Sequence, residues 1–134
     1  MAKKANFRKF QTQSGKLVLA GRDEESNEEL IEQVNQNELV FHTKVSGSPF
    51  VNIKSLSDKT TKEDIKETAL FCALFSKDWK KNRHDIIMHI FLGKDIYKTK
   101  DMKTGTFGVK NFKEIKLKRQ EIEAFEKLIK PKQT

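Results

Sequence analysis

The sequence is poor in residues and segments that would suit a secreted or membrane-embedded chain. Its 134 residues include one cysteine, Cys72, so no disulfide can form within the chain. No apolar run approaches the roughly 20 residues that a membrane-spanning helix needs, and the opening MAKKANFRKF lacks the apolar centre of a signal peptide. We therefore expect a soluble, intracellular protein located in the cytoplasm.

Long stretches of the chain lack charge of one sign. Residues 1–22 contain six basic and no acidic side chains, residues 23–38 contain seven acidic and no basic ones, and residues 94–119 contain nine basic and three acidic ones. With a net charge of +8, such segregation produces a local potential that attracts polyanions. The alternative is an ordinary lysine-rich surface, because charges of both signs are common on soluble domains.

Motifs of known enzymes and metal sites are also missing. There is no P-loop, GxSxG or HExxH pattern and no paired carboxylates. His84 and His89 are five positions apart, so in one strand they point to opposite faces, and Cys72 has no cluster of ligands around it. We expect no metal and no cofactor.

What the chain does have is enough apolar material for a single domain. Ten Phe and 36% hydrophobic residues supply a core. Alternation and helical periodicity predict an α+β fold, with a mostly antiparallel sheet and about three helices, that spans residues 1–134. Residues 1–5 form an expected disordered basic tail and residues 131–134 a frayed end. We expect strands over 6–12, 16–22, 38–45, 50–54, 85–91 and 112–118.

Capping patterns predict where the helices begin. Ser26 with Glu29, and Thr60 with Glu63, have the spacing of capping boxes. The second helix should continue to about Trp79 or Lys80. A third, 119–130, is expected to end at Pro131.

Several polar residues of the first half are candidates for nucleic-acid binding. Arg8 and Arg22 can each grip a phosphate through two parallel hydrogen bonds, or pair with Asp23 or Glu28. Asn27 can orient Arg22 or touch a base edge, or simply bond at the helix start. In the strand 38–45, one face is core and the other carries His42 and Lys44.

His42 is open to several interpretations. It can donate to a phosphate, stack on a base or act as an acid or base, but without an identifiable nucleophile we favour binding. Ser48 and the Gly47 amide can form an anion-binding nest, although a plain turn explains Gly47-Ser48-Pro49 equally well.

Two basic segments extend this candidate surface. Trp79 lies among Lys77, Lys80 and Arg83, where it can stack on a base or cover the core. In the arm 98–110, Gly105 and Gly108 would let the chain approach phosphates, with a solvated hairpin as the alternative. The lysines of this arm that suit backbone contact are Lys98, Lys100, Lys103 and Lys110.

The order and spacing of many of these residues resemble a known domain. The matching elements are Phe7-Arg8-Lys9-Phe10, Ser14-Gly15, Gly21-Arg22, Asn27-Glu28, Leu30, Glu38 to His42, Gly47-Ser48, Ala69 to Ser76 and Trp79. Together they resemble the NFACT-R domain, the C-terminal RNA-binding type of domain in ribosome-quality-control proteins of the fibronectin-binding-protein A-like family. The segment 98–109 resembles the tail of free-standing versions of that domain.

The resemblance implies contact with RNA, with ribosomal RNA or tRNA as the source and the ribosome as a possible partner. The tRNA-binding domain, helix-hairpin-helix segment and coiled coil of the full-length proteins are missing from this sequence, so we do not expect it to recruit tRNA for tail synthesis by itself. We therefore predict a non-catalytic RNA-binding module. DNA binding and the oligomeric state stay open. The alternatives are a nucleic-acid-processing enzyme that uses His42 and an adaptor that docks on a protein through the acidic helix 23–38.

Overall fold

A computed structural model describes the backbone of residues 6–133 and the side chains of residues 6–129. Its centre is a six-stranded antiparallel sheet of order β1-β2-β4-β3-β5-β8. In that order the strands are Arg8–Gln11, Leu17–Ala20, Val51–Leu56, Glu38–Thr43, Ile86–Leu92 and Lys113–Leu117. A small ribbon pairs β6 (Ile96–Tyr97) with β7 (Gly108–Val109).

Within residues 6–133 four helices accompany the sheet, and one of them is short. They are α1 (Glu24–Glu32), α2 (Lys62–Leu74), α3 (Lys77–Asn82) and α4 (Arg119–Gln133), with 3-10 turns at Ser57–Lys59 and Gly93–Asp95. The predicted α+β fold class with a mostly antiparallel sheet is confirmed. None of the helices in residues 6–133 combines the length and apolarity needed to cross a bilayer. The tail predicted for residues 1–5 lies outside the described residues.

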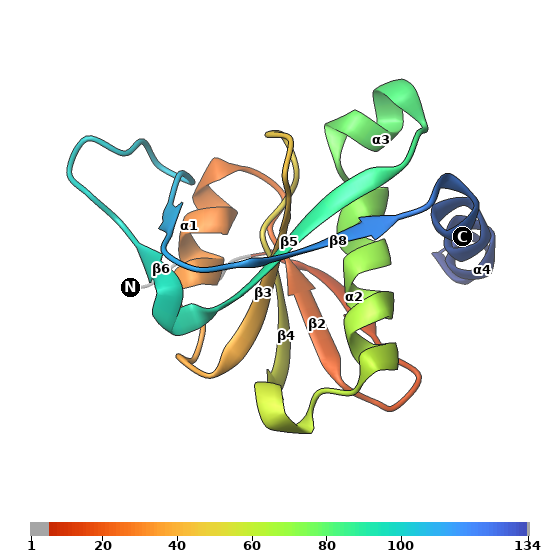
Figure 1. The fold of residues 1–134 in the computed structure, drawn as a ribbon, viewed down its shortest axis with the longest axis horizontal. Coiled ribbons are helices and arrows are strands. Elements are labelled where there is room, and N and C mark those ends of the chain that lie inside the picture. Colours follow the sequence, from red (N-terminus) through yellow and green to blue (C-terminus); the bar gives the residue numbers. More distant parts are fainter. Residues whose placement is uncertain (1–5, 134) are drawn as a thin grey trace.

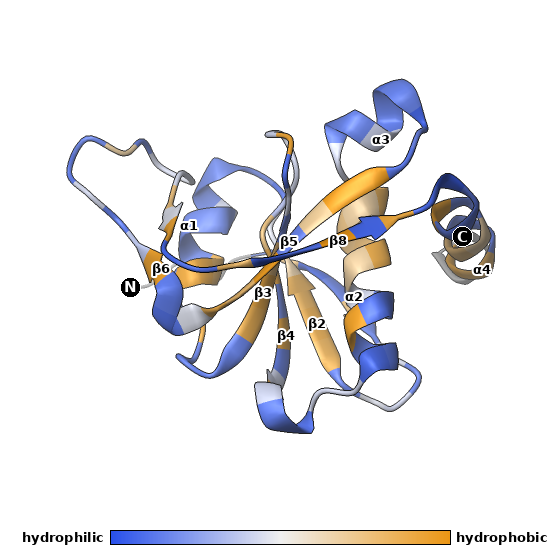
Figure 2. Ribbon diagram, in the orientation of Figure 1, coloured by the Kyte–Doolittle hydropathy of each residue, from blue (hydrophilic) through white to orange (hydrophobic). Residues whose placement is uncertain are grey.

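The elements form three layers (Figure 1). Helices α2 and α4 cover one face of the sheet, while α1 and the β6–β7 ribbon lie on the other side. The larger core unites inward strand residues with α2 and α4, and a smaller core joins Leu30 of α1 to Val40, Phe50 and Phe91. Figure 2 shows the same pattern, because the strands and the middle of α2 are apolar whereas α3 is mostly polar.

Strand β3 therefore has apolar contacts on both faces. Phe41 packs in the larger core and Val40 in the smaller one, and both are fully buried. The expectation of a single core face was wrong because α1 and the ribbon cover the first part of the second face. His42 lies further along that second face, where the cover becomes incomplete and its side chain is half-buried.

Both predicted capping boxes are shifted. Helix α1 begins after Asp23, whose Oδ1 accepts from the Ser26 amide at 2.8 Å while Ser26 Oγ accepts from the Asp23 amide at 3.0 Å. Helix α2 likewise begins after Thr61, which pairs with Asp64. A capping box needs an acidic residue and a hydroxyl residue three positions apart, and either of the two can come first. The sequence therefore allowed the observed starts as well as the predicted ones.

The long helix expected from Thr60 to Trp79 is two helices. Helix α2 ends at Leu74, and Ser76 caps α3 by accepting from the Trp79 amide at 3.2 Å. Ser76 also donates to the Ala73 carbonyl at 2.7 Å, which helps to close the end of α2. The apolar periodicity passes through this break and so conceals it. The predicted end of the last helix at Pro131 was also wrong, since α4 continues to Gln133.

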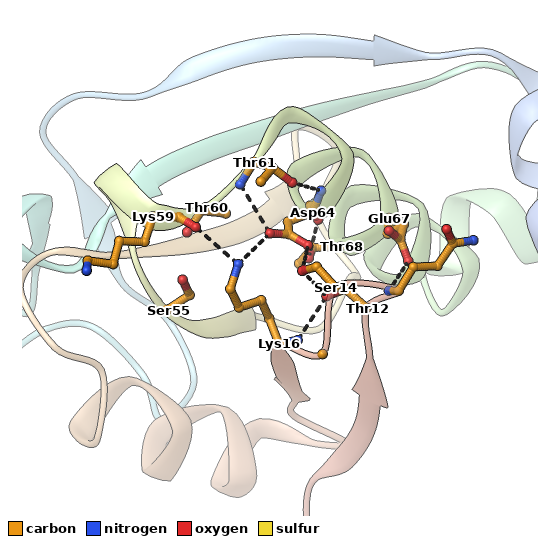
Figure 3. Close-up of polar contacts among 12 residues, drawn as sticks. Thr12, Ser14, Lys16, Ser55, Lys59, Thr60, Thr61, Asp64, Glu67 and Thr68 are labelled. Carbon is orange, nitrogen blue, oxygen red and sulfur yellow. Dashed lines mark hydrogen bonds and ion pairs between the residues drawn. The ribbon is translucent and has the colours of Figure 1, made fainter.

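A buried ion pair ties the β1–β2 turn to the start of α2 (Figure 3). Asp64 is 0% exposed and accepts from Lys16 Nζ at 2.8 Å, from Ser14 Oγ at 2.6 Å and from the Thr61 amide at 3.1 Å. Burial by itself would raise the pKa of this carboxyl, but these donors outweigh it and hold the pKa well below its ordinary value. The cluster fixes the end of the sheet that lies away from α3.

Candidate nucleic-acid interface

A hollow of about 630 Å³ opens where several element ends meet. The start of α1, the turn between β3 and β4, and α3 lie toward the same end of the molecule (Figure 1). The segment before β7 contributes Gly105, Thr106 and Phe107. The predicted site residues that line the hollow are Arg8, Arg22, Asn27, His42, Ser48, Lys77 and Lys80.

Arg8 and Arg22 bring two positive charges to this hollow. Burial of its guanidinium and, after that, the charge of Arg22 lower the pKa of Arg8. The Arg8 guanidinium carbon lies 4.4 Å from the ring centroid of Phe75, a cation–π contact that holds the side chain in place. Within the described residues neither arginine forms a salt bridge, so the ion pairs offered as an alternative are not seen. Two like charges held together favour a bound anion.

Lys77 and Lys80 add charge from α3. The Lys77 amide donates to the Gly47 carbonyl at 3.0 Å, and a Cβ on Gly47 would come within 3.2 Å of Lys77 Cδ. With a φ of 102°, Gly47 thus supports Lys77 by close packing. Ser48 is buried, accepts from the Thr43 amide and donates to the Pro49 carbonyl. The plain-turn alternative therefore describes Gly47-Ser48-Pro49 better than the anion nest does.

His42 is held at the wall of the hollow by its ring. Its Nδ1 lies 2.7 Å from the Thr43 carbonyl oxygen, and its ring centroid is 4.5 Å from that of Phe50. Burial lowers the pKa of His42; the bond to Thr43 opposes this change and the neighbouring His89 adds to it. His42 is therefore kept in its neutral form near pH 7.

Asn27 has a structural task that differs from each prediction made for it. Its Oδ1 accepts from the Phe50 amide at 3.1 Å, so it joins α1 to the start of β4. A Cβ on Gly21 would lie 2.0 Å from the same oxygen, which explains why a glycine precedes Arg22. Because this bond links residues 23 positions apart, sequence periodicity carries no sign of it.

Trp79, Arg83 and Lys44 do not join the hollow. Trp79 is 1% exposed and belongs to the larger core, as the core alternative proposed, which leaves no free ring face for a base. Arg83 covers that ring at 4.4 Å and pairs with Glu126 at 2.9 Å. Lys44 lies outside, 3.7 Å from Glu114.

The arm 98–110 is folded onto α1. Lys98 Nζ donates to Glu28 at 3.1 Å and to two carbonyls of its own loop, and the Gly105 amide donates to Glu28 at 2.7 Å. A Cβ on Gly105 would lie 2.9 Å from Glu24 Cα. Gly105 thus permits close packing on α1, and Gly108 permits close packing against the Tyr97 ring. Close packing within the protein therefore accounts for both glycines without an approach to phosphate. The other three predicted lysines, Lys100, Lys103 and Lys110, are exposed.

Comparisons with known proteins place this arrangement in a family. Residues 6–111 match the family described as the NFACT protein RNA binding domain, and all residues that line the hollow fall within this range. The chain belongs to the NFACT RNA-binding domain family. The resemblance read from the sequence is confirmed.

Two relatives illustrate the similarity. The archaeal Rqc2 homolog aRqcH of Methanocaldococcus jannaschii is 35% identical over 68 residues, which cover 50% of this chain and 10% of that protein. The chain thus matches only about a tenth of the length of that curated relative. The C-terminal structure of the fibronectin/fibrinogen-binding protein from Streptococcus suis superposes with a TM-score of 0.77 at 21% identity, covering 92% of this chain and 50% of that one. This NFACT domain shares its fold.

Three phenylalanines of the NFACT domain's hollow were missed as site residues. Phe50 lies beneath His42, Phe107 meets Phe50 edge-on at 5.5 Å, and Phe75 supports Arg8. Phe75 follows the helical periodicity of the apolar residues before it, which hides its second role. Phe107 did carry a signal, because an aromatic residue in a lysine-rich and glycine-rich loop needs a packing partner.

Proposed function

We propose that this NFACT domain binds structured RNA in the hollow, through phosphates and shape, without catalysis. The observation that carries the proposal is the convergence of Arg8, Arg22, Lys77 and Lys80, from three separate parts of the chain, around one partly apolar hollow of about 630 Å³. Guanidinium groups bind phosphate through paired, charge-assisted hydrogen bonds, and lysines add charge without fixed geometry.

Ribosomal RNA or tRNA is the proposed source of this RNA, with ribosome-associated quality control in the cytoplasm as the setting. The similarity to the archaeal Rqc2 homolog supports this choice. The exposed Lys100, Lys103 and Lys110 are close in the sequence to residues 105–107, which line the hollow. In this proposal they extend the positive surface beyond the hollow. Such contacts read the backbone rather than the bases.

The test measures binding of labelled tRNA and a labelled ribosomal RNA fragment by fluorescence anisotropy at low salt. Arg22→Ala should weaken binding about tenfold, since a charge-assisted hydrogen bond contributes about 1.5–3 kcal/mol. Lys62→Ala is the matched control, because Lys62 is also exposed but begins α2 and does not line the hollow. It should change affinity less than twofold.

The same samples distinguish the competing explanations. Arg22→Ala should keep the wild-type thermal transition, whereas loss of that transition would give Arg22 a structural role. Equal effects of both substitutions would contradict a binding site in the hollow. RNA integrity is checked on a gel, since cleavage that disappears in His42→Ala would favour the enzymatic alternative.

A further inference from the structure

The hydrogen bond of His42 fixes which ring nitrogen carries the proton. Nδ1 lies 2.7 Å from the carbonyl oxygen of Thr43, and a carbonyl oxygen only accepts. Nδ1 must therefore be the donor. In the neutral ring, the other nitrogen, Nε2, is then a hydrogen-bond acceptor with its lone pair in the ring plane.

Nε2 of His42 is available to a ligand. No residue in the described part of the chain hydrogen-bonds to it, whereas the equivalent atom of the neighbouring His89 contacts Glu114 at 2.8 Å. Among the described side chains, the one buried nitrogen or oxygen without a partner is Trp79 Nε1. The unpartnered Nε2 of His42 is therefore reached by solvent.

The position of this acceptor restricts what it can bind. His42 lines the same hollow as Arg8 and Arg22, so a nucleic-acid backbone held there places a sugar beside its phosphate. A phosphate oxygen is itself an acceptor and does not suit Nε2. The ribose 2′-hydroxyl is a donor, occurs on every ribonucleotide and is missing from DNA. Burial of the His42 ring lowers its pKa and so opposes protonation.

We propose that Nε2 of His42 accepts a hydrogen bond from a ribose 2′-hydroxyl, so that the hollow selects ribonucleotides over deoxyribonucleotides. This inference rests on the proposed binding of RNA in the hollow. A tilted ring contact with Phe50, at 4.5 Å between centroids, and the bond to Thr43 hold the His42 ring in one orientation, which is what a single selective hydrogen bond requires.

The experiment compares one fluorescein-labelled stem-loop made as RNA, as 2′-fluoro RNA and as DNA. The 2′-fluoro form keeps an RNA-like sugar but has no hydroxyl donor. The wild-type domain should bind RNA about fivefold more tightly than 2′-fluoro RNA, as expected for one hydrogen bond. His42→Phe keeps a ring on Phe50 but removes the acceptor, and should bind the two forms equally.

Two further variants control for folding and for general loss of histidine. His42→Gln retains an acceptor and should keep part of the preference. His84→Phe changes a histidine that does not line the hollow, and this variant should keep the full preference for RNA over 2′-fluoro RNA. All variants are compared by thermal unfolding.

The outcomes separate this inference from the proposed function. Equal wild-type binding of RNA and 2′-fluoro RNA, or a preference that survives in His42→Phe, would overturn the 2′-hydroxyl contact while RNA binding stands. Weaker binding of both forms by His42→Phe without any wild-type preference would assign Nε2 to a base amino group instead. If the wild type binds none of the three probes at low salt, the proposed function fails as well.

Discussion

At the residue scale, Asp64 joins parts of the chain that are about 50 positions apart. It is fully buried, and its carboxylate binds Lys16 and Ser14 of the first hairpin. Removing one partner of a buried ion pair typically costs about 3–5 kcal/mol. Lys16 is 26% exposed, so we expect a smaller loss of unfolding free energy, about 2–3 kcal/mol, for Asp64→Asn.

The lowered pKa of Asp64 also predicts how the stability of the fold depends on pH. Since the pKa of Asp64 is lowered in the folded state, the charged form stabilises the fold above the unfolded pKa near 4. That contribution is lost as the pH falls below about 4 toward the folded pKa. Urea unfolding at several pH values should show a steeper acid loss in the wild type than in Asp64→Asn. Parallel curves for the two proteins would contradict the assignment.

Single residues also show how far the sequence could predict the site. Strand alternation drew attention to Arg8 and His42, and both line the hollow; Arg22 lines it too, but from the segment beyond the end of β2. The bond from Lys98 to Glu28 was not foreseen, because the two residues are 70 positions apart in the chain. Trp79 offered two interpretations, and the break at Ser76 decided between them by directing the ring into the core. Periodicity describes local structure, so it predicts neither the bond between Lys98 and Glu28 nor the packing of Trp79 in the core.

At the element scale, the position of the arm 98–110 depends on how closely it approaches α1. Gly105 has a φ of 81°, and its amide donates to Glu28. Gly105→Ala adds a Cβ 2.9 Å from Glu24 Cα, so the arm must move away from the helix. Because Phe107 lies in this arm and lines the hollow, we expect weaker RNA binding together with a loss of about 2 kcal/mol in unfolding free energy.

Gly15→Ala is the matched control for this element. Gly15 has a similar φ of 95°, but an added Cβ there meets nothing within 4 Å. It should lose about 1 kcal/mol from backbone strain alone and keep its RNA affinity. Denaturant unfolding and anisotropy on both variants measure the difference. If the two variants behaved alike, backbone strain rather than packing on α1 would explain the requirement for glycine.

Elements were predicted well where one interaction dominates. The strands follow from alternation, and all six sheet strands fall close to their expected ranges. Helix starts shifted because each start offers more than one acid and hydroxyl pair at the capping distance. The break between α2 and α3 was missed because a buried serine closes one helix and opens the next without interrupting the apolar pattern.

At the scale of the whole molecule, charges of both signs meet at the hollow, where the acidic Asp23 and Glu24 lie beside a larger number of basic side chains. The acidic helix α1 is partly neutralised, since Glu28 binds Lys98 and the Gly105 amide. Among the described residues, four cationic side chains line the hollow, namely Arg8, Arg22, Lys77 and Lys80. The proposed function gives these charges two roles: the net charge of +8 attracts RNA over a distance, and the hollow determines where the RNA is held.

This division of roles predicts how binding responds to salt. Each neutralised phosphate releases counterions, so four contacts give a slope of roughly −3 in log affinity against log salt. Removal of one contact by Arg22→Ala should reduce that slope by roughly one, whereas Lys62→Ala should leave it unchanged. The slopes are measured by anisotropy across a salt series. A wild-type affinity independent of salt would mean that phosphates are not the groups recognised. A slope that fell equally in both variants would mean that total charge, and not the hollow, holds the RNA.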